Sequence, residues 1–280
     1  MVTRVRLAAV SAAVLTLFSA TVVTPAVAQG ASGPPTVVAT VTSKTITFSH
    51  GTSVHAGRVT FKVVAPSGDH TLQLAKLTPG YSLRQAGADI AAAFSGKVSA
   101  VRTIDKKILF LGGAEATPSH PGYFAETLYA GTYYAFDQNG NAITTLHVFG
   151  TPPMRDWVHE TSTITATNAH RFATSPTVLP ASGWTLFRNA ADEPHFIVFQ
   201  QVQPTTTAKM VSDYLASGNQ NPPPWGLPGT TSTGVISPGR QILFHHQLPA
   251  GSYVILCYWP DDQTGMPHAL MGMWKLVTLK

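Results

Sequence analysis

The sequence is poor in cysteine and in charge, and each shortage removes a class of protein. Its 280 residues include 1 cysteine, Cys257, and 11% of them are charged. A single cysteine cannot form an intramolecular disulfide, so a small disulfide-stapled domain is excluded. The thiol must therefore be a small buried side chain, a partner for another chain, or a metal ligand.

The charge that is present is mildly basic and scattered along the chain. The formal net charge is +5, but we find no stripe of Lys and Arg with interleaved aromatic residues, so nucleic-acid binding is not predicted. No stretch after the N-terminal segment is apolar enough to cross a bilayer. We therefore expect no membrane span in the mature protein.

The N-terminal segment has the pattern of a signal peptide. Two arginines precede an apolar run at 7–23, and Ala26-Val27-Ala28 is a small-x-small cleavage site. We expect residues 1–28 to be removed, residues 29–36 to form a spacer, and the protein to be secreted to the extracellular side.

The rest of the chain reads as an all-β protein that repeats one pattern. Its Val, Ile, Tyr and Phe stand in short runs separated by Gly, Pro, Ser and Thr, as in strands and turns. The motif DHTLQL at 69–74 resembles PHFIVF at 194–199, and LYAGTY at 128–133 resembles LPAGSY at 248–253. The offset of about 120 residues indicates a domain duplication.

The predicted fold is therefore two tandem Greek-key β-sandwiches, each with one short helix. The first would cover 37–150 and the second 161–280, with a linker at 151–160 that begins in a proline-rich break. The helices are expected at 82–94 and 207–216, where Ser82 and Thr207 can serve as caps.

The C-terminal stretch holds the residues that suggest chemistry. Cys257 ends one apolar strand, His268 follows it, and Met273 precedes another strand. Thiolate, imidazole and thioether are soft or borderline ligands that together suit copper. Met266 and Met271 are rival thioethers, but Met273 is preferred because it follows a glycine and begins the last strand.

These residues resemble the ligand set of cupredoxins, the blue-copper proteins. Pro194-His195 at the start of an apolar strand is similar to the strand that carries their first histidine, and 251–273 is similar to their C-terminal ligand loop. The resemblance implies that His195, Cys257 and His268 are trigonal ligands of one type 1 copper, with Met273 as the axial ligand. Phe196 departs from the asparagine common in the family.

The spacing of this ligand loop is also a departure. Ten residues lie between Cys257 and His268, which is longer than in most small cupredoxins and closer to copper nitrite reductases. The first half keeps His70, but Asp137 stands opposite Cys257. The first domain is therefore expected to be metal-free.

We do not expect an enzyme. The trinuclear cluster of laccases needs His-x-His pairs, which the sequence lacks, and His245-His246 would point to opposite faces of a strand. No Gly-x-Ser-x-Gly hydrolase motif is present either.

The expected function is electron transfer or copper handling, with a redox partner protein. The loop 221–226, which contains three prolines and Trp225, is expected to be exposed, either as a docking surface or as a stiff connector. The alternative left open is a metal-free secreted β-sandwich with a binding or structural role.

Overall fold

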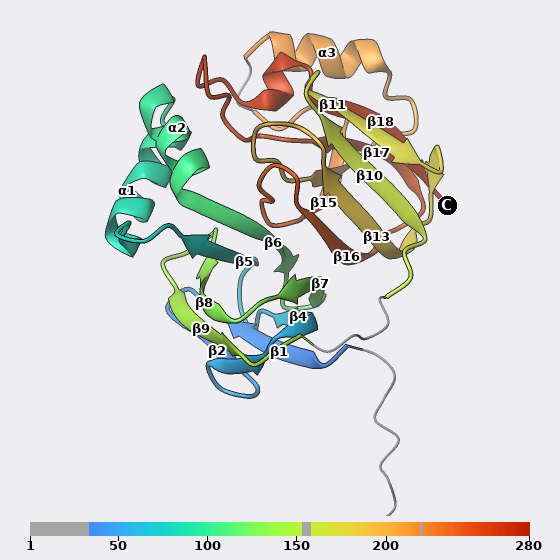
Figure 1. The fold of residues 1–280 in the computed structure, drawn as a ribbon. Coiled ribbons are helices and arrows are strands. Elements are labelled where there is room, and N and C mark those ends of the chain that lie inside the picture. The colour runs from blue at the N-terminus through green and yellow to red at the C-terminus, as the bar shows by residue number, and fades with distance from the viewer. Residues whose placement is uncertain (1–33, 153–157, 219–220) are drawn as a thin grey trace, which may run out of the picture. The chain divides into compact units, whose positions relative to one another are not determined.

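The computed structural model describes residues 34–152, 158–218 and 221–280 (Figure 1). The predicted signal peptide, most of the spacer and part of the linker lie outside these ranges. Within the described part of the chain, no helix is long and apolar enough to cross a membrane.

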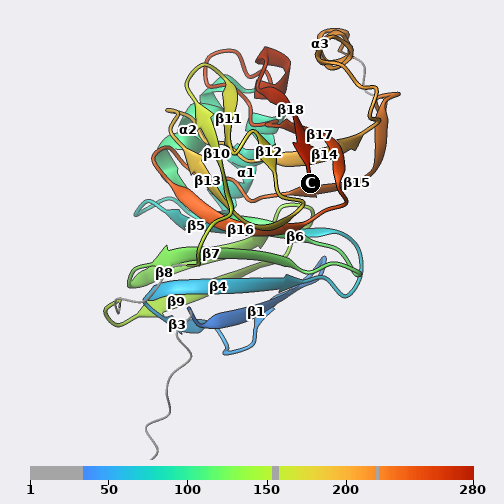
Figure 2. The same ribbon diagram turned by 90° about the vertical axis from the view of Figure 1, so that its right-hand side faces the viewer.

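The largest sheet has eight strands and contains members from both halves of the chain. In spatial order these are β11 (Arg171–Ser175), β10 (Ser162–Thr167), β13 (Ser182–Asn189), β16 (Gln241–Gln247), β7 (Gly122–Leu128), β4 (Gly57–Val64), β1 (Thr36–Val41) and β2 (Ile46–Phe48). Figure 2 shows β7, β4 and β1 running side by side in this order.

Two five-stranded sheets complete the sandwiches, one from each half. The first has the order β3 (Ser53–His55), β9 (Ile143–Phe149), β8 (Gly131–Asp137), β5 (His70–Leu77) and β6 (Ile108–Ala116). The second has the order β12 (Val178–Leu179), β18 (Trp274–Leu279), β17 (Gly251–Leu256), β14 (Val198–Val202) and β15 (Gly226–Ser232). The two strand orders correspond position by position, as a duplication requires.

The halves meet along β7 and β16, which pair antiparallel at the centre of the eight-stranded sheet. Phe124 lies opposite Phe244, and this pair has the same offset as Gly131 and Gly251, the first residues of β8 and β17. The all-β prediction is confirmed. Because Gly33–Lys280 forms one compact unit, the domain limits at 37–150, 151–160 and 161–280 stay a prediction.

Two helices begin where their caps were expected. Ser82 and Gln85 form a capping box at α1 (Leu83–Phe94), and the Thr207 side chain caps α3 (Ala208–Ala216). The first half also contains α2 (Val98–Lys107), which the sequence did not predict. Its N-cap is Lys97, whose side chain makes no capping hydrogen bond, so the usual start signal is missing.

The strand β5 is the clearest buried strand of the first half. In β5 six consecutive residues, His70 to Ala75, are buried, which agrees with a strand covered on both faces. In the loop 221–226, Asn221, Pro222 and Pro224 are exposed as expected. Trp225 differs from the expectation, since it is 4% exposed and packs edge-on against Tyr214 of α3. The indole therefore anchors the loop to the core and is not available for docking.

Candidate metal centre

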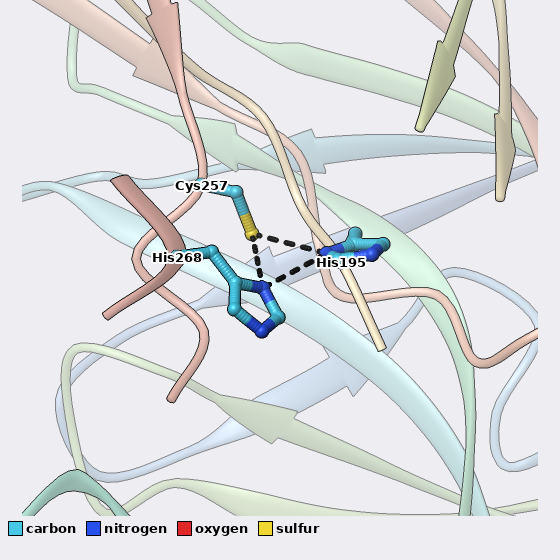
Figure 3. Close-up of side chains that lie close together, drawn as sticks. All are labelled: His195, Cys257 and His268. Atoms are coloured by element: carbon cyan, nitrogen blue, oxygen red, sulfur yellow. Dashed lines mark hydrogen bonds between the residues drawn. The ribbon is translucent and has the colours of Figure 1, made fainter. Parts of the chain in front are cut away.

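Three of the four expected ligands come together in the core. The Nδ1 atoms of His195 and His268 lie 3.1 Å apart, and they are 3.5 and 3.8 Å from Cys257 Sγ. Figure 3 shows the three side chains turned toward one another. Their exposed fractions are 1%, 0% and 0% for His195, Cys257 and His268, so the site is closed to bulk water.

The triangle formed by these atoms has the size of a metal site. A point equidistant from corners 3.1, 3.5 and 3.8 Å apart lies about 2.0 Å from each, which is close to metal bond lengths of about 2.0–2.3 Å for imidazole and thiolate. Burial and the neighbouring imidazoles of His268 and His170 hold the pKa of His195 well below its usual value. His195 is therefore neutral, as a ligand must be.

The ten residues between Cys257 and His268, 258–267, form a loop that folds back on itself, and we call this loop the ligand excursion. The His268 amide donates to the Trp259 carbonyl at 2.9 Å, and the Ala269 amide donates to the Cys257 carbonyl at 2.6 Å. Pro260 and Pro267 form a further bridge between the two arms. The ten intervening residues thus bring the thiol and the imidazole to one point rather than separating them.

The tip of this excursion is closed by Asp261. Its Oδ1 accepts hydrogen bonds from the amides of Gln263 and Thr264 and from the Thr264 hydroxyl. Burial raises the pKa of Asp261, but these hydrogen bonds outweigh it and keep the pKa below the usual value. The ionised carboxylate therefore holds the turn.

His195 is fixed by backbone pairing before β14 begins. The expected strand at 195–199 starts at Val198 instead, and His195 forms an isolated bridge with Ile236 at 3.0 and 2.8 Å. Ile236 also bridges Leu111 of β6, in the first half of the chain. This arrangement needs glycine at Gly234, because a Cβ there would lie 2.4 Å from the Gly113 nitrogen.

The sulfur of Cys257 accepts backbone hydrogen bonds from Phe196 and Trp259. Burial nevertheless raises the pKa of the thiol to about 12, and the charge of Glu193 adds to the rise. The absence of asparagine at Phe196 leaves this contact intact, because it is the backbone N–H that reaches the sulfur. In a site this buried, a bound cation is needed to keep the thiolate at neutral pH.

Glu193 is a site residue that the sequence analysis missed. Its Oε2 lies 2.8 Å from His268 Nε2, so Nε2–H donates to the carboxylate and Nδ1 keeps its lone pair toward the centre. Metal-bound histidines are commonly oriented in this way. Asn189, which is buried, donates to the Glu193 carbonyl at 2.8 Å and fixes the turn. The signal available in the sequence was the position of the Glu193 carboxylate, two residues before the candidate ligand His195.

Met273 is buried and linked to the other candidates through the backbone. Its amide donates to the His268 carbonyl at 2.9 Å, and its carbonyl accepts from the Cys257 amide at 3.2 Å. Gly272 precedes it with φ of 103°, and a Cβ there would lie 2.6 Å from Arg171 Nη1. The role of Met273 as an axial ligand stays a prediction.

The first half contains the same hydrogen-bond frame around a different pair. His70 Nδ1 lies 2.7 Å from Asp137 Oδ2, and both side chains are buried. Asp137 Oδ1 accepts from the amides of Thr71 and Asn139, as Cys257 accepts from those of Phe196 and Trp259. A hydrogen-bonded His–Asp pair thus occupies the position of the candidate metal site, and no His/Cys/Asp/Glu group of metal-binding size is found among the described residues of this half.

The ligand excursion also packs on the first half of the chain. The Trp259 ring meets Phe110 of β6 and Phe94 of α1 edge-on at 5.2 and 5.7 Å. Arg102 of α2 donates through Nε to the Asp262 carbonyl at 2.7 Å. The two helices, which precede β6 (Figure 1), therefore support the loop that carries His268.

Asp105 of α2 makes stability depend on pH at this contact. Burial, together with the charges of Glu193 and Asp262, raises the pKa of Asp105 to about 7. Because the pKa of Asp105 is higher in the folded than in the unfolded protein, ionisation of this carboxyl group destabilises the fold. The destabilisation is absent below about pH 4, grows as the pH rises to about 7, and is constant above that pH. Asp105→Asn should therefore raise the urea midpoint at pH 8 and leave it unchanged at pH 4. An equal shift at both pH values would contradict this account.

No protein-family model and no curated protein matches the sequence. Auracyanin A, a blue copper protein from Chloroflexus aurantiacus, aligns with 42% of this chain and 100% of its own at 17% identity and a TM-score of 0.30. A Cu-containing nitrite reductase from Thermus scotoductus aligns with 89% of this chain and 68% of its own, at 13% identity and a TM-score of 0.23. The multicopper oxidase McoA from Aquifex aeolicus aligns with 88% of this chain and 65% of its own, at 11% identity and a TM-score of 0.24.

The fold is cupredoxin-like. The corresponding strand orders and the convergence of His195, Cys257 and His268 agree with the resemblance found in the sequence. The expectation that the chain is not an enzyme is wrong as an exclusion, because the structures that align with 88–89% of it include copper enzymes.

Proposed function

We propose that this chain binds one type 1 copper ion through His195, Cys257 and His268, with Met273 as the weak axial ligand, and that it transfers single electrons. The observation that carries the proposal is the buried triangle of one sulfur and two imidazole nitrogens, with edges of 3.1–3.8 Å. Two imidazoles and a thiolate with a weak axial thioether form the ligand set of electron-transfer copper sites.

Electron transfer is favoured over copper handling because the ligands are fixed. His195 is held by a backbone bridge, and His268 is held by Glu193 and by the folded excursion. A protein that exchanges copper needs at least one ligand that opens to solvent, whereas these three are closed. A site whose ligands are already in place changes little between two oxidation states.

Secretion and a redox partner protein are parts of the same proposal. They are supported by the signal-peptide pattern at 1–28 and by the need of a one-electron carrier for a donor and an acceptor. The alternative is a metal-free secreted β-sandwich with a binding or structural role.

Visible spectroscopy of the purified protein tests the copper proposal. Addition of one equivalent of Cu(II) should produce an intense thiolate-to-copper band, and the copper should survive gel filtration with a chelator in both oxidation states. His195→Gln should alter or abolish the band, because it removes a trigonal ligand.

His70→Gln is the matched control, since His70 occupies the duplicate position in the first half. It should leave the band unchanged. The absence of a band in the unmodified protein, or the same response to both substitutions, would contradict the proposal and favour the metal-free alternative.

A further inference from the structure

A second group of metal-binding side chains lies on the outer side of His268. It consists of His170, Glu193, Asp261 and His268, and we call it the outer cluster. One ligand atom from each residue lies within 4.8 Å of the others. His268 is shared with the inner triangle, because its Nδ1 faces Cys257 whereas its Nε2 faces Glu193.

The members of the outer cluster come from three separate segments that are held together by the fold. His170 lies in the turn between β10 and β11 with φ of 47°, a left-handed conformation that is uncommon for residues other than glycine. Arg171 ties this turn to the end of the ligand loop, because its Nη1 donates to the carbonyls of His170 and Gly272 at 2.9 and 3.0 Å. The His170 and His268 rings then lie 4.7 Å apart.

The two carboxylates are oriented with an oxygen toward these rings. The Oδ1 of Asp261 is committed to the turn at 263–264, which leaves Oδ2 4.0 Å from His170 Nε2. Glu193 Oε2 lies 2.8 Å from His268 Nε2. Asp261 is 3% exposed and His268 is 0% exposed, so this is a partly enclosed site and not an acidic patch on the surface.

The donor set and its dimensions fit a tetrahedral divalent ion. Two imidazoles and two carboxylates are ligands of zinc, with bonds of about 2.0–2.2 Å and neighbouring ligand atoms about 3.4 Å apart. The Glu193–His268 separation of 2.8 Å and the Asp261–His170 separation of 4.0 Å lie on either side of that value. Side-chain movements of about half an ångström at Glu193 and His170 would therefore complete the geometry.

We propose that His170, Glu193, Asp261 and His268 bind a second metal ion, Zn²⁺ or a similar divalent cation, on the Nε2 side of His268. The zinc ion replaces the proton on Nε2, which leaves to solvent, so that the His268 ring joins the two metals. The shared ring links this site to the proposed copper function, and the zinc site itself does not require copper or Cys257.

The test measures bound metal after gel filtration. Protein loaded with one equivalent of copper should retain about one zinc ion, and zinc should shift the thiolate-to-copper band because it withdraws electron density from the His268 ring. His170→Asn, which keeps a residue that tolerates the left-handed turn, should abolish zinc retention and the shift but keep the band. His120→Asn, at an exposed histidine in another turn, should change neither.

A Cys257→Ala background separates the two proposals. It should lose the copper band and still retain one zinc ion, whereas Cys257→Ala with His170→Asn should retain none. If the unmodified protein gives no copper band, the proposed function fails and this background still decides the zinc site. Zinc retention that is zero throughout, or equal with and without His170, would overturn the second site and leave the outer cluster as a support for His268 only.

Discussion

Cys257→Ala will abolish the thiolate-to-copper band and lower copper affinity by more than the roughly 10–100-fold that loss of an outer-shell partner costs. The sulfur supplies the charge that balances the ion, and two histidines alone make a weaker, neutral site. Because Cys257 is 0% exposed and belongs to the main hydrophobic core, alanine fits the position. The fold should therefore survive, and circular dichroism should show this.

Glu193→Gln provides the graded comparison for this prediction. Its amide can still hold His268 but carries no charge, so the copper band should remain while affinity falls within the roughly 10–100-fold range. Competition with a copper chelator measures both variants. Equal losses in the two variants would contradict the assignment of Cys257 as a ligand and Glu193 as its outer support.

Trp259→Ala will have the largest effect on stability, a loss of about 3–5 kcal/mol. The ring is 1% exposed and is enclosed by Phe94 and Phe110 of the first half. Removal of the ring leaves a cavity beneath the ligand excursion that leads to His268. The hydrogen bond from the His268 amide to the Trp259 carbonyl then loses the packing that supports it. Copper release should therefore become faster as well.

Trp184→Ala is the matched control, because Trp184 is half-buried in β13 and meets His245 edge-on. It should cost less stability and leave the rate of copper release unchanged. Urea unfolding and stopped-flow transfer of copper to a chelator measure the two quantities. A Trp259→Ala protein that unfolds earlier but releases copper at the original rate would show that the first half does not support the site.

The sequence was sufficient for the fold class and for the three candidate ligands that converge in the core. The alternation of apolar residues, the duplicated motifs and the order His195, Cys257, His268 all reflect local or repeated features of the chain. The correspondence of Asp137 with Cys257 was also accessible by aligning the halves. The structure adds that the amides of Thr71 and Asn139 hydrogen-bond to that aspartate in the same way as the amides of Phe196 and Trp259 do to Cys257 in the candidate metal site.

The features that the sequence did not reveal depend on contacts between distant segments. The helix α2 has no side-chain cap and is stabilised by burial of Val101 and Ile104. Glu193 and His170 are polar residues in turns, and nothing local distinguishes them from solvated ones. They become site residues only because backbone pairing and Arg171 bring those turns onto His268.

X-ray absorption at the copper edge of the copper-loaded protein tests the central claim most directly, because it identifies the atoms bonded to the metal. The account predicts one short bond to sulfur and two to imidazole nitrogens, with the sulfur lost in Cys257→Ala. A first shell of nitrogen and oxygen alone, unchanged by that substitution, would contradict it.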